Sequence, residues 1–334
     1  MSMMMPQTIV PLQRKIRLLQ NFTRDWAGEV VDSEGLVRLL NANGTQPPLI
    51  WCFNAEHEFP ALAGALGPDQ PVIGLRSLNT VVDFTRKNLG EDYEISRYYA
   101  QILRRHFDHQ KVWIGGNCQG AAVSAELANA YTQSGVEVSG QMLLEFSSLL
   151  PWPGSCHFLF GAESQDFNPF LRGVDPWPLW ELIYGAVDCA VLPGGHGEYF
   201  LPHRVGDLVA QLHAIFTRPY QTPPPDAARQ APELAKAIVP DTTAISADIE
   251  IAFDTDSRFE AAERICAVWL PHDFGREHRH ELCELVTWGD GVSCTVRAPA
   301  EPGTWMLKLF SCNREDGPFG WHKDIHLAWT ILVQ

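Results

Sequence analysis

The stretch KVWIGGNCQGAAVSAELANAY, residues 111–131, constrains the fold more than any other part of the chain. Its first residues are apolar and typical of a strand, and its alanine-rich second half is typical of a helix. Between them, residues 116–120 have the G-x-C-x-G spacing of a nucleophile elbow, with Cys118 at its centre. Gly116 and Gly120 would let the strand and the helix pass close to each other. The pattern predicts a raised thiol at the start of a helix, where the helix dipole favours a thiolate; the simpler alternative is a glycine turn with a structural cysteine.

Strand-like and helix-like runs alternate on both sides of this motif, between residues 35 and 220. PPLIWCF, PVIGLRSL, GQMLLEF and CHFLFG are typical of strands, whereas YEISRYYAQILRRHF and EYFLPHRVGDLVAQLHAIF are typical of amphipathic helices. PPLIWCF is almost wholly apolar, which indicates a central strand buried on both faces. The alternation predicts an α/β domain with a mostly parallel sheet covered by helices on both faces.

Three other segments complete the predicted domain organisation. Residues 1–34 form an N-terminal segment in which PLQRKIRLLQNF is one amphipathic helix, with Ile16, Leu19 and Phe22 on one face. Residues 221–243 are rich in proline and alanine and predict a linker. In residues 244–334 about six short alternating runs are separated by Gly, Pro and Asp, which predicts a small all-β domain resembling a sandwich.

Composition restricts the class of protein. The net charge of −15 argues against nucleic acid or an anionic membrane surface as a partner. No stretch approaches the roughly 20 apolar residues of a membrane span, and the start of the chain does not have the pattern of a secretory signal. The eight cysteines are scattered without paired spacing, which favours free thiols in a reducing compartment. We therefore expect a cytoplasmic protein.

A cysteine on such a turn needs a base and an orienting acid to act as a nucleophile. Glu145 ends the strand-like run GQMLLEF, and His196 lies in the glycine loop PGGHG, so the three residues follow each other in the order nucleophile, acid, histidine. Asp166, after the next strand-like run, is a rival for the acid. The alternative for Glu145 is a surface carboxylate, and for His196 a solvated loop histidine.

These blocks together resemble one family, the thioesterase domains of nonribosomal peptide and polyketide synthesis, within the α/β-hydrolases. The resemblance covers roughly residues 36–217 and is carried by PPLIWCFNAEHEFPALAGALGPDQPVIGLRS, KVWIGGNCQG, QMLLEF and LPGGHGEYF. It implies that Cys118 is the nucleophile, His196 the general base and then acid, and Glu145 the residue that fixes the imidazole tautomer. It also implies an oxyanion hole made by the backbone N–H groups of Gln119 and of Ala55 or its neighbour.

The chain departs from the family pattern in four ways. The nucleophile is Cys where the family usually has Ser, and the acid is Glu where it usually has Asp. FNAEHEF replaces a glycine-rich oxyanion loop and brings Glu56, His57 and Glu58 near the site. The family's helical lid has no room, because only about ten residues separate Glu145 from the next strand-like run, CHFLFG.

A cysteine nucleophile favours acyl transfer or cyclisation as much as hydrolysis, because the acyl-cysteine is itself an activated thioester. The resemblance implies no bound cofactor, and an acyl donor that is a phosphopantetheine thioester on a separate carrier protein, or a CoA thioester. An amine or alcohol acceptor is possible. The alternative of another class is a non-catalytic scaffold, in which the fold is retained and the β domain is the working part.

Three further groups of residues lie outside the predicted triad. Trp152, Trp177 and Trp180 could pack in the core or line an acyl pocket, with core packing favoured. The run HDFGREHRHELCE, residues 272–284, contains His, Cys, Asp and Glu, but its spacing fits no tetrahedral zinc pattern, so we expect a solvated loop and no metal. His203 and Tyr199 are expected to be packing or rim residues.

Overall fold

The computed structural model describes most of the chain. The described residues are 12–82, 91–107, 111–146, 150, 152–172, 176–177, 180, 184–218, 242–254, 264–271, 279–284, 286–288, 291–312 and 326–334. They divide into two compact units, one comprising Lys15–Val81 and Ile95–Gln230 and the other comprising the remaining residues, most of them in Ala231–Gln334.

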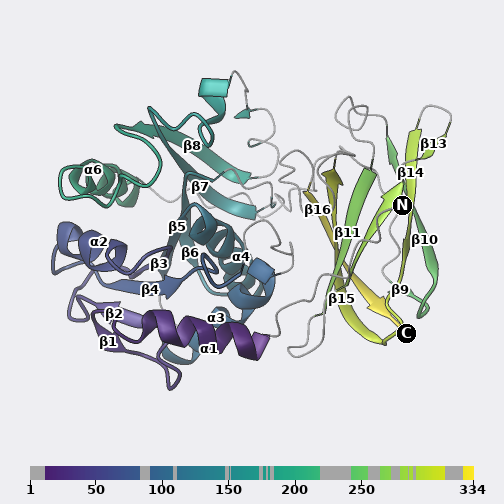
Figure 1. Ribbon diagram of the computed structural model, residues 1–334, viewed down its shortest axis with the longest axis horizontal. Coiled ribbons are helices and arrows are strands. Elements are labelled where there is room, and N and C mark those ends of the chain that lie inside the picture. The colour runs from purple at the N-terminus through teal and green to yellow at the C-terminus, as the bar shows by residue number, and fades with distance from the viewer. Residues whose placement is uncertain are drawn as a thin grey trace. The chain divides into compact units, whose positions relative to one another are not determined.

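An eight-stranded sheet forms the centre of the first unit, with strand order β1-β2-β4-β3-β5-β6-β7-β8 (Figure 1). The strands are β1 (Glu29–Val30), β2 (Arg38–Leu40), β3 (Leu49–Phe53), β4 (Val72–Arg76), β5 (Val112–Asn117), β6 (Val138–Leu144), β7 (Trp152–Gly161) and β8 (Tyr184–Leu192). The strands from β4 to β8 pair in parallel, whereas β1 and β2 pair antiparallel at one edge. The prediction of a mostly parallel sheet is therefore confirmed.

Helices cover both faces of this sheet. They are α1 (Leu12–Thr23), α2 (Glu58–Leu66), α3 (Glu91–Phe107), α4 (Gln119–Gln133) and α6 (Val205–Phe216), with a short 3-10 helix η2 (Pro169–Arg172). Figure 1 shows α2 and α6 together on one side of the sheet, with α3 and α4 on the other. The helices that connect the parallel strands thus together cover both faces of the sheet, as the predicted alternation requires.

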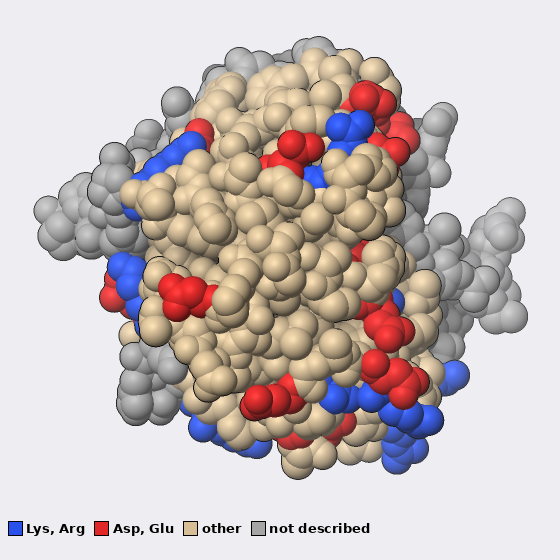
Figure 2. Space-filling view, turned by 90° about the vertical axis from the view of Figure 1, so that its left-hand side faces the viewer, with Lys and Arg blue, Asp and Glu red and all other residues tan. Residues whose placement is uncertain are grey.

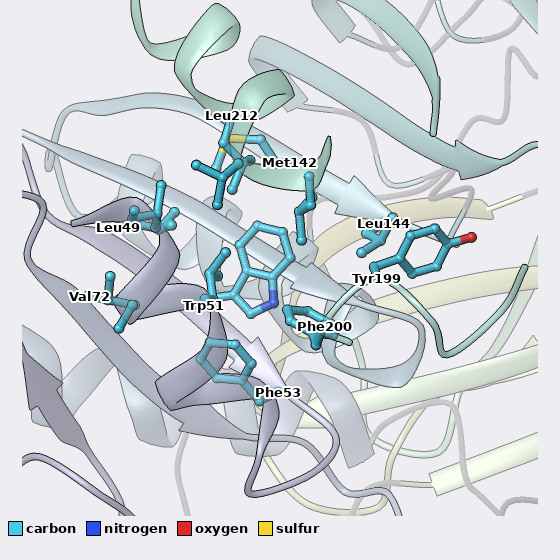
Figure 3. Close-up of a cluster of buried hydrophobic side chains, with 14 of the residues drawn as sticks. Leu49, Trp51, Phe53, Val72, Met142, Leu144, Tyr199, Phe200 and Leu212 are labelled. Carbon is cyan, nitrogen blue, oxygen red and sulfur yellow. The ribbon is translucent and has the colours of Figure 1, made fainter. Parts of the chain in front are cut away.

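Strand β3 shows how the apolar sequence produces this layering. All five of its residues are buried. Leu49, Trp51 and Phe53 point into a core shared with α2 and α6, where Leu212 and Phe200 also lie (Figure 3). Side chains alternate along a strand, so the residues between them face the layer of α4. The expectation of a central strand that is buried on both faces is confirmed.

The helix α1 forms where PLQRKIRLLQNF predicts it, but it buries a different face. The buried residues are Lys15, Leu19 and Thr23, whereas Phe22 is 41% exposed. Thr23 donates its hydroxyl to the carbonyl oxygen of Gly35, and this contact turns the helix away from the face that apolar spacing alone selects.

The connection between β6 and β7 consists of residues 145–151, which leaves no room for a helical lid at this position. This agrees with the prediction of little or no lid there.

The second unit contains two small sheets built from β9 (Thr242–Thr243), β10 (Asp248–Asp254), β11 (Arg264–Pro271), β12 (Arg279–Glu284), β13 (Val286–Trp288), β14 (Gly291–Arg297), β15 (Gly303–Cys312) and β16 (His326–Val333). Their orders are β10-β14-β13 and β12-β11-β15-β16-β9. Alternate residues are buried in both sheets, for example Ile249 and Ile251 in β10 and Trp305 and Leu307 in β15. A small all-β part is therefore present, as predicted.

Two details of this unit differ from the sequence analysis. One of the short alternating runs predicted as single strands, ELCELVTW at residues 281–288, is divided between β12 and β13, which belong to different sheets. Thr242 and Thr243, assigned above to the linker, pair in parallel with β16. A two-residue strand is too short to produce an alternating pattern. The remainder of the predicted linker, residues 221–241, lies outside the described residues.

Charged side chains are mixed on the face that carries α2 and α6. Figure 2 shows acidic and basic residues around an uncharged middle, without a concentration of either sign. None of the described helices is long and apolar enough to cross a membrane.

Candidate active site

Cys118 lies between β5 and α4 in a strained backbone conformation, with φ 49° and ψ −116°. A Cβ atom on Gly116 would lie 2.5 Å from the carbonyl oxygen of Gly120, and one on Gly120 would lie 2.0 Å from the carbonyl oxygen of Cys52. Only glycine fits at either position, because real Cβ atoms do not approach backbone oxygens so closely. The turn therefore has the close approach of strand and helix that its spacing predicts, and it leaves Cys118 as a partly exposed free thiol.

Backbone hydrogen bonds place the acid beside this turn. The N–H of Cys118 donates to the carbonyl oxygen of Leu144 at 2.8 Å, and the N–H of Glu145 donates to that of Leu159 at 2.8 Å. These bonds extend the parallel register of β5, β6 and β7 by one residue at their carboxyl ends. Glu145, the first residue after β6, also has a positive φ of 59°.

The carboxylate of Glu145 is buried and accepts four hydrogen bonds. Its side chain is 1% exposed. The donors are the N–H of Gly161 at 2.7 Å, the hydroxyls of Ser164 and Tyr199, and Nδ1 of His196 at 3.2 Å. Burial raises the pKa of Glu145, but the hydrogen bonds more than offset this effect, so its pKa lies below the ordinary value. The group is therefore a satisfied carboxylate anion.

His196 connects this carboxylate to the thiol. Its ring is 42% exposed and stacks on Phe167, with centroids 4.0 Å apart and planes 11° from parallel. The neighbouring thiol of Cys118, and the hydrogen bond with Glu145, raise the pKa of His196 to about 9. Since Nδ1 faces Glu145, Nε2 is the nitrogen left for the sulfur. The raised pKa favours the imidazolium form of His196.

The loop that carries His196 follows β8. Gly194 and Gly197, on either side of it, have φ values of 97° and 85°, which side chains rarely adopt. The carbonyl oxygen of Gly194 accepts the N–H of Glu163 at 3.0 Å, which ties the loop to the end of β7. The path of this loop thus favours glycine at these two positions.

The structure brings Cys118, His196 and Glu145 together and leaves Asp166 apart. Asp166 is exposed, and its carboxylate makes no hydrogen bond or ion pair with any other described residue. The geometry thus connects Glu145, and not the rival acid, to the imidazole. A thiol, an imidazole and a buried carboxylate in series can transfer a proton from the sulfur and stabilise the imidazolium that results.

The oxyanion loop differs from the simplest expectation. The N–H of Ala55 donates to Oε2 of Glu58 at 3.1 Å, so this predicted donor already has an acceptor. By contrast, the N–H groups of Gln119 and of Glu56, the neighbour of Ala55, have no acceptor among the described residues.

The tryptophans pack in the core, as favoured above. Trp152 is 2% exposed and donates its indole N–H to Thr132 at 2.9 Å, and Trp180 is fully buried and stacks on Phe158 with centroids 4.0 Å apart. Trp177 is half-buried and makes an edge contact with Trp180.

Three residues at the site have roles that the sequence did not indicate. Tyr199 was expected on a helix as a packing or rim residue, but it precedes α6, is 3% exposed and donates to Glu145. Ser164 and Phe167 lie in the turn after β7, where no motif marks them. His203 is exposed, as expected for a rim residue.

The expectation of a solvated loop at residues 272–284 is wrong for residues 279–284, which form strand β12 and pair with β11; residues 272–278 lie outside the described residues. Among the residues that the structure does describe, no three His, Cys, Asp or Glu side chains form a group that could hold a metal ion.

The strand order, with a nucleophile turn after β5, defines the first unit as an α/β-hydrolase fold. No protein-family model matches the chain, and no curated protein matches its sequence.

Several solved structures have a similar fold, at low identity. One is the NocB thioesterase domain from the Nocardicin cluster, with 17% identity and a TM-score of 0.44 over 54% of this chain and 98% of that one. Another is YbtT, a type II thioesterase from the yersiniabactin pathway, with 13% identity and a TM-score of 0.43 over 54% of this chain and 98% of that one. The thioesterase domain SrfTE, which cyclises the lipopeptide surfactin, has 12% identity and a TM-score of 0.42 over 55% of this chain and 96% of that one.

Proposed function

We propose that the protein is a cysteine-dependent acyl-processing enzyme of the thioesterase type. The observation that supports this best is the hydrogen bond of the His196 imidazole with the buried carboxylate of Glu145, in a site where the thiol of Cys118 raises the pKa of the same imidazole. Catalytic sites often combine a strained backbone with titratable groups whose pKa values are shifted. Here the strained turn, the histidine with a raised pKa and the hydrogen-bonded buried carboxylate lie at the same edge of the sheet.

The first step we propose is acylation. His196 holds the proton that came from the Cys118 thiol, as its raised pKa favours, and the sulfur attacks the acyl carbon of a thioester. The tetrahedral intermediate collapses with loss of the donor thiolate, which receives the proton back from His196. One carbon–sulfur bond forms and one breaks, so the free-energy change of this step is close to zero. Glu145 keeps the imidazole in the tautomer that the transfer needs and stabilises its charge.

The second step releases the acyl group. An amine, an alcohol or water attacks the acyl-cysteine while His196 accepts the proton of the attacking group and returns it to the sulfur of Cys118. We propose two alternatives for this release, without preferring either: transfer or cyclisation, and hydrolysis. The proposed acyl donor is a phosphopantetheine thioester on a carrier protein, or a CoA thioester, in a natural-product pathway. A reducing compartment such as the cytoplasm would keep the thiol available.

The test is turnover of an acyl-pantetheine thioester, followed by release of free thiol and by analysis of products with and without an amine or alcohol acceptor. We expect Cys118→Ala to abolish turnover and Cys189→Ala to leave it unchanged. Cys189 is the matched control because burial raises the pKa of its thiol to about 11, which makes it a poor nucleophile at neutral pH. No turnover in the unaltered protein would favour the scaffold alternative, whereas equal turnover in Cys118→Ala would contradict Cys118 as the nucleophile.

A further inference from the structure

Glu58 occupies the oxyanion loop in an unusual way. It is the first residue of α2, five positions after the end of β3, and it is only 8% exposed. Its carboxylate folds back onto the loop, where Oε2 accepts the N–H groups of Asn54 at 2.8 Å and of Ala55 at 3.1 Å. A single oxygen thus fixes two successive peptide units.

The other oxygen of the same carboxylate reaches the nucleophile turn. Oε1 of Glu58 accepts Nδ2 of Asn117 at 3.2 Å, and Asn117 directly precedes Cys118. In the opposite direction, Nδ2 of Asn54 donates to the carbonyl oxygen of Asn117 at 2.7 Å. Asn54, Glu58 and Asn117 therefore form a closed polar ring between the oxyanion loop and the turn that carries the thiol.

Contacts outside the ring fix the orientation of both amides. Oδ1 of Asn117 accepts the indole N–H of Trp51 at 3.1 Å, and Oδ1 of Asn54 accepts the hydroxyl of Ser77 at 2.6 Å. Since each amide oxygen is occupied by a donor, each amide nitrogen must face the ring. A buried network in which every member is satisfied is rigid and specific.

The polar ring of Asn54, Glu58 and Asn117 determines which backbone N–H of the loop is left to bind a substrate. The N–H of Ala55 is used by Glu58, whereas that of Glu56, the next residue, has no acceptor among the described residues. An oxyanion hole needs donors that are already oriented and unoccupied.

We propose that Glu58 is a positioning residue that locks the oxyanion loop onto the nucleophile turn, so that the backbone N–H of Glu56, and not that of Ala55, joins that of Gln119 in binding the acyl oxygen. This inference rests on the proposed acylation of Cys118. Glu58 itself exchanges no proton and forms no bond with the substrate.

Two reactions of the same thiol separate this role from a purely structural one. Acylation by an acyl-pantetheine thioester develops negative charge on the acyl oxygen, whereas alkylation by iodoacetamide is a displacement at carbon that needs no oxyanion hole. We expect Glu58→Ala to slow acylation by about 100-fold, the loss typical of an oxyanion donor, while alkylation of Cys118 changes by less than about twofold.

Two further variants test the geometry. Glu58→Gln keeps one oxygen for the two loop N–H groups but places an amide NH2 against Nδ2 of Asn117, so we expect it to acylate more slowly than the unaltered protein and faster than Glu58→Ala. Glu58→Asp keeps the charge but shortens the arm, so we expect it to resemble Glu58→Ala. Glu29→Ala, at an exposed carboxylate in β1, is the matched control and should change neither reaction.

Three results would overturn the inference: an unchanged acylation rate in Glu58→Ala and Glu58→Asp, a parallel loss of acylation and alkylation, or a Glu58→Gln variant no better than Glu58→Asp. If Glu58→Ala does not fold, the comparison of Gln with Asp still decides. An unaltered protein that is alkylated but never acylated would instead contradict the proposed function, and this role with it.

Discussion

At the scale of the residue, His196 is the most informative group because two different partners act on it. The neighbouring thiol of Cys118 raises the pKa of His196 more than the hydrogen bond with Glu145 does, and together they bring it to about 9. We predict that Cys118→Ala lowers the pKa of His196 markedly, and that Glu145→Gln lowers it to a smaller extent. An NMR titration of the imidazole protons would measure both changes. A pKa that stays near 9 in Cys118→Ala would show that the thiol and the ring do not interact.

The same shift has a consequence for stability. Because the folded pKa of His196 lies above the ordinary value of 6.5, its contribution is complete below about pH 6.5 and is lost as the pH rises through about 9. We predict that the difference in unfolding free energy between the unaltered protein and His196→Ala decreases between pH 6.5 and pH 9.5. Denaturant unfolding at several pH values would measure it. A difference that grows with pH contradicts the assignment.

The choice of acid is also a matter of single residues. Glu145 accepts four hydrogen bonds and contacts His196, whereas Asp166 is exposed. We predict that Glu145→Gln lowers the acylation rate by at least about 100-fold, because the imidazole loses its orienting anion. Asp166→Asn should stay within about twofold. A larger loss in Asp166→Asn would reverse the assignment.

At the scale of the element, the contact between β3 and the start of α4 depends on one glycine. A Cβ atom on Gly120 would meet the carbonyl oxygen of Cys52, so we predict that Gly120→Ala destabilises the protein by about 1–3 kcal/mol, as overpacking does. Gly64→Ala is the control, because Gly64 lies in α2 with open space around it and alanine there should stabilise by up to about 1 kcal/mol. Thermal unfolding would compare them; equal effects would contradict the close packing.

The sequence predicted elements well where one local rule dominates. Continuous apolar residues predict β3, alternation of strands and helices predicts the parallel sheet, and glycine spacing predicts the sharp turn at Cys118. It failed where tertiary contacts decide. The face that α1 buries depends on a contact of Thr23 with Gly35, which is distant in sequence.

For the candidate site, too, the sequence predicted what local patterns specify and missed what tertiary contacts specify. Strand ends identify Glu145, and a glycine loop identifies His196. The hydroxyls of Ser164 and Tyr199, and the ring of Phe167, are brought in by turns whose paths no motif encodes. The engagement of Ala55 by Glu58 could not be anticipated either, because it depends on the side chain folding back onto its own loop.

At the scale of the whole molecule, three strand ends far apart in sequence supply one site. Cys118 follows β5, Glu145 follows β6 and His196 follows β8, and all three lie in the unit that comprises Lys15–Val81 and Ile95–Gln230. We predict that a chain ending at Gln230 remains folded and is acylated at a rate within a small factor of the full chain. Circular dichroism and the acylation rate would measure this. A folded but inactive truncated chain would show that the β-rich unit is needed for the reaction.

The central claim is that Cys118 carries the acyl group. Intact-mass spectrometry after brief mixing with an acyl-pantetheine thioester, followed by peptide mapping, tests it most directly. We predict one added acyl mass, located on the peptide that contains Cys118 and absent from Cys118→Ala. An acyl group on another residue, or no added mass from a protein whose Cys118 is readily alkylated by iodoacetamide, would contradict it.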